Sequence, residues 1–283
     1  LAWTCSTCDY EFWCTSRQIT PDHSDQSIAP LTVLSWDIEV RNGTTADRKR
    51  MQSLGLDKFP KASDPTNQVI QISVIIELVD GRVLPFLLEL DDEEEHTGEN
   101  AYARRTFEGN EYHVFWFQSE PDMICFWRDL LVYYDPDITL SFNGDRFDWP
   151  YVIARMGDRP PDAQHGRFFQ MGRVVSDYWD TKFTSYRTVS LGAGRKRDVP
   201  VLNDEGEDLP KKRLPLAQLA LESGVELTPE LPGRVALDFC SLIRDLSKAD
   251  KFLAFKNYTL DNMSARFLKD KKVNFTHNDI FDA

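Results

Sequence analysis

Two short segments contain three acidic residues whose types and spacing could bind divalent metal ions. Asp37 and Glu39 lie in the alternating run 31–40, so a strand there would point both carboxylates to one face. The other face would carry the apolar residues Leu34, Trp36, Ile38 and Val40. Neighbouring carboxylates repel each other unless a cation neutralises them, and hard divalent cations prefer oxygen ligands. The pattern favours a metal-dependent phosphodiesterase, although most Asp-x-Glu triplets in an acidic chain are solvated surface.

The third carboxylate, Asp148, stands at the start of an expected helix. It follows an apolar strand at 138–142 and the turn-forming pair Asn143 and Gly144, and Pro150 suits the first helical turn. Free backbone N–H groups and the helix dipole favour anions at such a position. The alternative is structural, with Asn143 and Gly144 forming only a turn and Asp148 serving only as a helix cap.

The same two segments resemble exonuclease motifs of the family B DNA polymerases. Residues 28–39, which end in Trp-Asp-Ile-Glu, are similar to the first motif, especially in delta-type replicative enzymes and their relatives in large DNA viruses. Residues 141–151, which contain Asn-Gly-Asp-Arg-Phe-Asp, are similar to the second motif in a form closer to epsilon-type polymerases. Three further segments agree in order with the delta-type pattern, at 64–73, 233–238 and 258–268.

This resemblance implies a ribonuclease H-like α/β fold, which is a mixed sheet flanked by helices. It implies a 3′→5′ proofreading exonuclease within a DNA-directed DNA polymerase, the nucleotidyltransferase of DNA replication. Asp37, Glu39 and Asp148 would be catalytic and would hold two Mg²⁺ or Mn²⁺ ions about 3.5–4 Å apart for hydrolysis of the 3′-terminal phosphodiester. The substrate would be the single-stranded 3′ end of primer DNA. The residues expected to bind DNA are Asn143, Phe147, Arg195, Lys196 and Arg197.

The resemblance also predicts how the chain is organised. Residues 1–29 would end a preceding N-terminal domain, and residues 30–283 would form the exonuclease domain, truncated at its C-terminus. In this family a β-hairpin that helps to separate primer from template lies in the exonuclease domain, and we expect a hairpin or insertion at about 185–232. The alternative for this region is a polar insertion with runs of charge.

The third exonuclease motif of the family, Tyr-x-x-x-Asp, should follow the segment 258–268, and no match lies between that segment and Ala283. The first residue is Leu rather than Met. We therefore expect an internal piece of a longer polymerase, without polymerase motifs and weak or inactive as a nuclease alone. Should the missing acid lie within this sequence, the candidates are Asp238, Asp261 and Asp279. The alternatives are a stand-alone ribonuclease H-like nuclease and a non-catalytic exonuclease-fold module that braces a polymerase.

Composition limits the class of partner. A net charge of -13 opposes indiscriminate nucleic-acid binding. Screening beyond about 8 Å still allows basic residues to line a local channel. No apolar run reaches membrane-spanning length and no signal-peptide pattern begins the sequence, so we expect an intracellular protein that is not secreted and has no membrane partner. The resemblance implies the nucleus or a viral replication compartment, with the remainder of the polymerase chain as partner and replication accessory subunits as further candidates.

The remaining patterns predict an α/β layer architecture. Strands are expected at 69–76, 82–88 and 112–117, and a helix between Ser119 and Asp135. The apolar and aromatic residues of this helix keep helical spacing, which is more typical of a core than of a base-stacking platform. Cys5-x-x-Cys8 resembles half a zinc site, but no second pair follows at ligand spacing, and the scattered cysteines favour reduced thiols.

Overall fold

The computed structural model describes most of the chain between residues 29 and 269. The described residues are 29–43, 60–91, 96–107, 109–157, 165–174, 182–190, 196–200, 217–218, 221, 226–250 and 254–269, with short pieces before residue 29. The chain divides into two compact units, Leu1–Leu237 and Asp238–Ala283. Within these described ranges, no helix has the length and apolar character that a membrane crossing requires.

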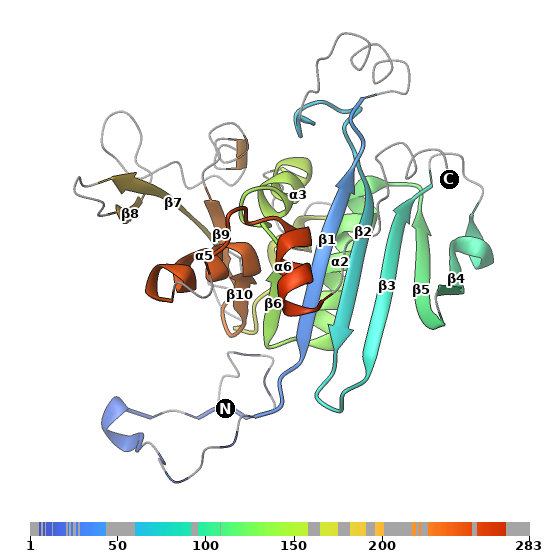
Figure 1. Ribbon diagram of the computed structural model, residues 1–283. Coiled ribbons are helices and arrows are strands. Elements are labelled where there is room, and N and C mark those ends of the chain that lie inside the picture. The colour runs from blue at the N-terminus through green and yellow to red at the C-terminus, as the bar shows by residue number, and fades with distance from the viewer. Residues whose placement is uncertain are drawn as a thin grey trace. The chain divides into compact units, whose positions relative to one another are not determined.

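A seven-stranded mixed sheet is the main element of the first unit (Figure 1). Its strand order is β10-β6-β1-β2-β3-β5-β4. The strands are β1 (Val33–Val40), β2 (Val69–Glu77), β3 (Val83–Leu90), β4 (Tyr102–Phe107), β5 (Asn110–Phe117), β6 (Ile138–Ser141) and β10 (Val235–Asp238). β1 is antiparallel to β2 and parallel to β6, and β3 is parallel to β5. With its flanking helices, this sheet confirms the predicted α/β class.

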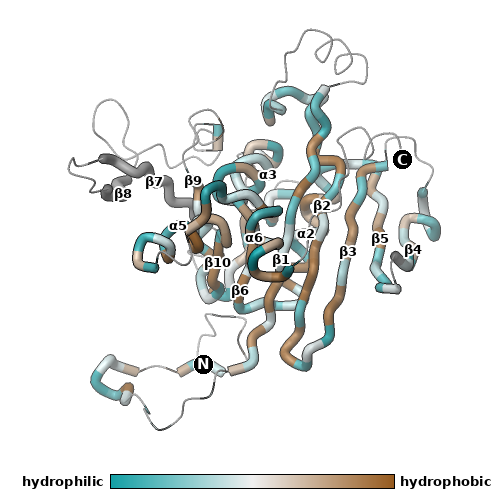
Figure 2. The backbone as a smooth tube through the Cα atoms, in the orientation of Figure 1, coloured by the Kyte–Doolittle hydropathy of each residue, from teal (hydrophilic) through white to brown (hydrophobic). Residues whose placement is uncertain are grey.

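Strand β1 confirms the predicted alternation. Leu34, Trp36, Ile38 and Val40 are all buried. The intervening residues are exposed or half-buried, because successive side chains of a strand point to opposite faces. Figure 2 shows hydrophobic stretches along the central strands β1, β2 and β3. The two acids of this strand therefore share the face that is turned away from the core.

Two helices cover the buried face of the sheet. Helix α2 (Glu120–Tyr134) runs behind the sheet in Figure 1 and contacts β2, β3 and β5. Helix α3 (Asp148–Met156) follows β6 along the chain. A cluster of three tryptophans joins them to β1: the Trp36 ring centroid lies 4.3 Å from that of Trp127 and 4.9 Å from that of Trp149. Such tilted and edge-on pairs stabilise a core beyond the area that they bury.

The sequence analysis predicted neither of the two edge strands of this sheet, β10 and β4. β4 shows why such a strand is missed. Its central residues are Ala103, Arg104 and Arg105, which give no apolar alternation. Pairing with β5 over six residues, from Tyr102↔Phe115 to Phe107↔Asn110, supplies the backbone hydrogen bonds that make it a strand. Edge strands often carry charged residues, which oppose pairing with other chains.

A second, three-stranded sheet has the order β8-β7-β9. Its strands are β7 (Lys182–Ser190), β8 (Lys196–Pro200) and β9 (Glu226–Glu230), and β7 is antiparallel to both neighbours. β7 and β8 are consecutive and pair up to Ser190↔Lys196, so they form a hairpin within the first unit. Most of this sheet falls in the region 185–232, where the sequence predicts a hairpin or insertion. Its role in strand separation stays a prediction.

The second unit contains helices α5 (Phe239–Ala249) and α6 (Leu260–Phe267). Asp238 is the N-cap of α5, where its carboxylate accepts the backbone N–H groups of Cys240 and Ser241. The Phe255 ring contacts Tyr258 and Phe267, which packs the connecting segment against α6.

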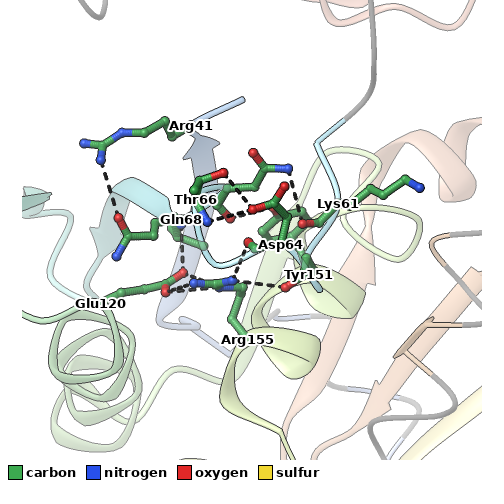
Figure 3. A network of polar contacts seen from close by, with 11 residues as sticks. Arg41, Lys61, Asp64, Thr66, Gln68, Glu120, Tyr151 and Arg155 are labelled. Atoms are coloured by element: carbon green, nitrogen blue, oxygen red, sulfur yellow. Dashed lines mark hydrogen bonds and ion pairs between the residues drawn. The ribbon is translucent and has the colours of Figure 1, made fainter. Parts of the chain in front are cut away.

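A buried ion pair between Glu120 of α2 and Arg155 of α3 also binds the segment that precedes β2 (Figure 3). Arg155 Nε donates to Glu120 Oε1 at 2.8 Å, and the two side chains are only 12% and 6% exposed. Arg155 Nη1 also donates to the carbonyl oxygens of Ala62 and Asp64, each at 3.0 Å. Glu120 Oε1 accepts the backbone N–H of Val69 at 2.8 Å. The pair therefore holds the first residue of β2, the strand next to β1.

We expect Arg155→Met to lower the free energy of unfolding by about 3–5 kcal/mol, because it leaves the Glu120 carboxylate buried without its guanidinium partner. Urea unfolding followed by tryptophan fluorescence measures this, since the tryptophan cluster lies in the same unit. The matched control is Arg167→Met, which removes an Arg167–Asp129 pair whose side chains are 62% and 36% exposed. This control should change the stability by less than about 1 kcal/mol. Equal effects of the two substitutions would contradict the structural role of the buried pair.

Candidate active site

Asp37 and Asp148, which are 111 positions apart in the sequence, lie in contact in the structure. A hydrogen bond joins their two carboxyl groups. Asp148 is only 2% exposed, and its Oδ1 accepts the backbone N–H of Ile38 at 3.2 Å. Asp148 is therefore held against the stretch of β1 that carries the other two acids.

Glu39 lies two residues after Asp37, on the same face of β1, and it is half-buried. In the sheet register it is opposite Gln71 of β2. In the part of the chain that the structure describes, no group of three or more His, Cys, Asp or Glu side chains is arranged to hold a metal ion. The structure thus brings Asp37 and Asp148 into contact and places Glu39 on their side of the strand.

The surroundings of Asp148 raise its pKa well above the usual range. Burial is the largest cause, the charge of Asp37 is the second, and the hydrogen bond with the Asp37 carboxyl acts in the same direction. The N–H of Ile38 opposes the shift because it stabilises the charged form. A divalent cation would allow both carboxylates to ionise, and oxygen ligands suit Mg²⁺ and Mn²⁺. This pair therefore fits the predicted metal ions.

A tight turn sends the chain from β6 back toward β1. Asn143 takes the left-handed conformation with φ 63°, as short polar residues do more readily than others. A β-carbon at Gly144 would collide with Ser141 Oγ and lie 3.4 Å from Asp148 Oδ2. The carbonyl of Gly144 accepts the N–H of Trp149 at 2.9 Å, which closes the turn onto α3. Ser141 therefore leaves no space for a side chain at position 144.

The residues predicted to bind DNA are spread over several elements. Asn143 lies in the turn before Asp148, and Phe147 precedes the first residue of α3, where its ring packs 5.3 Å from that of Tyr151. Lys196 and Arg197 lie in β8, opposite residues 190 and 189 of β7. Arg195 falls outside the described residues. Their contacts with DNA stay predictions.

The sequence reasoning overlooked Asp145, which is 7% exposed and lies three positions before Asp148. Its carboxylate accepts the hydroxyl of Thr228 at 2.6 Å. The available signal was a second acid inside the apolar surroundings of the turn. Two of the alternative acids lie in the second unit, where Asp238 caps α5 and Asp261 is in the first turn of α6. The third, Asp279, falls outside the described residues.

We expect Asp148→Asn to stabilise the protein at pH 7 in the presence of EDTA. Since the folded-state pKa of Asp148 is raised, its contribution to stability is largest below the unfolded pKa of about 3.9 and is lost as pH rises through the folded pKa. Asparagine removes the buried charge and keeps an oxygen that can accept the Ile38 N–H. The melting temperature should rise by about 2–4 °C for each kcal/mol gained. Adding Mn²⁺ should reduce the difference in melting temperature between Asp148→Asn and the wild type, because the ion stabilises the wild type.

The control for this measurement is Asp122→Asn. A hydrogen bond from His165 lowers the pKa of Asp122, so its contribution to stability is present above the unfolded pKa and is lost as pH falls through the folded pKa. At pH 7 this substitution should lower the melting temperature. A lower melting temperature for Asp148→Asn in EDTA would show that the buried carboxylate does not oppose folding.

Comparison with known proteins gives the family. Residues 3–192 match the DNA polymerase family B exonuclease domain. The DNA polymerase delta catalytic subunit of Dictyostelium discoideum is 26% identical over 271 residues, which cover 94% of this chain and 18% of that protein. The Candida albicans subunit is 27% identical over 289 residues, which cover 98% of this chain and 21% of that protein. A DNA polymerase of Bombyx mori nuclear polyhedrosis virus is 36% identical over 78 residues, which cover 24% of this chain and 8% of that protein.

The chain spans about a fifth of the length of the delta subunits that it matches. The family match covers more than half of the 283 residues and includes all three predicted acids and the turn before Asp148. Together with the mixed seven-stranded sheet and its flanking helices, it confirms the predicted ribonuclease H-like fold. The chain therefore belongs to the exonuclease domain family of the family B DNA polymerases.

Proposed function

We propose that this chain is a 3′→5′ exonuclease domain that removes nucleotides from the single-stranded 3′ end of primer DNA. The observation that carries the proposal is the contact between Asp37 and Asp148, two carboxylates from the segments that resemble the first and second exonuclease motifs. Relatives named DNA polymerase delta catalytic subunit support a proofreading role inside a longer polymerase chain. As part of a polymerase, the domain would have the rest of the polymerase chain and replication accessory subunits as partners. It would act in the nucleus or in a viral replication compartment.

The roles of the three acids follow from their positions. Asp37 and Asp148 would be ligands of the metal ions, and Glu39 would be a further ligand from the same face of β1. When bound, Mg²⁺ or Mn²⁺ activates a water molecule for attack and stabilises the departing 3′ oxygen. The Ile38 N–H keeps Asp148 oriented toward its partner.

Selectivity for mismatched ends follows from the cost of separating the strands. Stacking contributes about 1.4 kcal/mol per step, so freeing roughly three base pairs costs on the order of 4 kcal/mol. A mismatched end frays at lower cost and so reaches the carboxylates more often. Asn143 and Phe147 are the proposed contacts for the terminal nucleotides, because both lie in the segment that leads to Asp148. Lys196 and Arg197 of β8 are proposed to bind the phosphate backbone. Arg195, which falls outside the described residues, is proposed to do the same.

We expect Asp37→Ala combined with Glu39→Ala to lower the rate of 3′ shortening roughly a thousandfold, which corresponds to about 4 kcal/mol of transition-state stabilisation. The measurement follows 5′-labelled single-stranded DNA with Mg²⁺, both with the 283-residue chain and with the longer polymerase chain that the proposal implies. EDTA should abolish the shortening in the wild type.

The matched control replaces two exposed acids of the same types, Asp80→Ala with Glu99→Ala, and so makes the same change in net charge. It should retain wild-type activity. The proposal fails if the wild type shows no metal-dependent shortening in either chain, or if the control loses as much activity as the double variant.

A further inference from the structure

The turn that carries Asp148 is fastened to strand β9 by three polar contacts. The backbone carbonyl of Asp145 accepts the N–H of Leu227 at 2.7 Å. The Asp145 carboxylate accepts the Thr228 hydroxyl at 2.6 Å. Beside them, Arg146 Nη2 donates to Glu226 Oε1 at 2.7 Å. Consecutive residues of the turn thus meet consecutive residues of β9, which lie at least 80 positions later in the sequence.

The contacts made by Asp145 are the ones that should hold the turn in place. Asp145 is 7% exposed and Leu227 is fully buried, so little water competes for their hydrogen bonds. A hydroxyl that donates to a buried carboxylate is a charge-assisted bond and is stronger than a neutral one. The side chains of Arg146 and Glu226 are 41% and 33% exposed, and a pair of that kind contributes little.

The contacts of Asp145 link two parts of the structure, the start of α3 at Asp148 and the three-stranded sheet that contains β9. Toward the site, α3 begins at Asp148, and the carbonyl of Gly144 accepts the N–H of Trp149 at 2.9 Å, so the turn is hydrogen-bonded to the start of the helix that carries Asp148. Away from the site, β9 pairs with β7 from Tyr186↔Glu226 to Lys182↔Glu230, and β7 pairs with β8. The β7–β8 hairpin is therefore connected to the turn through β9 and the contacts that β9 makes with Asp145 and Arg146.

We propose that Asp145 is a positioning residue that, through Thr228, holds the turn in the conformation that places Asp148 beside Asp37. It thereby couples the carboxylate pair to the β7–β8 hairpin. The consequence for hydrolysis rests on the proposed function, whereas the coupling between β9 and the turn does not.

The test uses three variants of the 283-residue chain. Thr228→Val keeps the shape of the side chain and removes the hydroxyl donor. Thr228→Ser restores the donor and serves as the rescue. Thr66→Val is the matched control, because Thr66 donates an equivalent bond to Asp64 at 2.7 Å in an exposed turn. The three variants separate loss of this hydroxyl from the general effect of replacing a threonine.

The first readout is amide hydrogen exchange, which requires no activity. In Thr228→Val, exchange should become at least about tenfold faster at Trp149, whose N–H is bonded to Gly144, and at Ile38, whose N–H is bonded to Asp148. The serine variant and the Thr66 control should exchange like the wild type at both sites. Unchanged exchange at these two amides in Thr228→Val would overturn the coupling.

The second readout is the affinity for Mn²⁺ alone, together with the steady-state constants on single-stranded DNA. Residues that orient a metal ligand typically affect metal affinity by about 10–100-fold, so we expect a loss of roughly tenfold in Thr228→Val. The value of kcat should fall while KM changes little, and serine should restore both affinity and rate. Faster exchange with unchanged Mn²⁺ affinity would show that Asp145 holds the turn without positioning Asp148, which would overturn the proposal.

The two proposals can fail separately. If the wild type bound no Mn²⁺ through Asp37 and shortened no DNA, the proposed function would be wrong. The exchange rates would still decide whether Thr228 holds the turn. If the wild type bound Mn²⁺ and shortened DNA while Thr228→Val behaved like the Thr66 control, only the role of Asp145 would be rejected.

Discussion

The contact between the Asp37 and Asp148 carboxyl groups is the constraint on which the surrounding structure depends. Burial and mutual repulsion both favour the protonated form of Asp148, so ionising the pair without a cation opposes folding at neutral pH. Functional sites commonly hold such unfavourable arrangements, which the rest of the fold must offset. Here the backbone N–H groups of Ile38 and of Asp148 itself stabilise the charged form directly, and packing holds the two segments together.

That packing is organised around the tryptophan cluster. Asp37 follows Trp36 in β1, and Asp148 precedes Trp149 in α3, so each acid is the chain neighbour of a buried indole. The rings of Trp36 and Trp149 meet edge-on, and Trp127 of α2 contacts both. Within the described part of the chain, the indole N–H groups of Trp36 and Trp127 are buried without hydrogen-bond partners, which is a further cost. Close packing of three large rings fixes the two backbones, and with them the two carboxylates.

Much of the fold and part of the site could be predicted from the sequence. The alternation in β1, the bounds of α2 and the turn before α3 are local patterns, because a period of two or 3.6 residues reports which side chains share a face. Five motifs in the right order also indicated the family, which the match over residues 3–192 confirms. The edge strand β4 was missed because its arginines follow no apolar period, and only pairing with β5 makes it a strand.

By itself, then, the sequence determined that Asp37 and Glu39 share one face of a strand and that Asp148 begins a helix. Only the tertiary structure decided that Asp37 and Asp148 touch, because that depends on the parallel pairing of β6 with β1 and on the turn at Gly144. It also decided that Asp145 meets Thr228, a partner 83 positions away. Periodicity carries information about neighbours along the chain, whereas contacts between distant segments follow from strand order, register and the packing of the core.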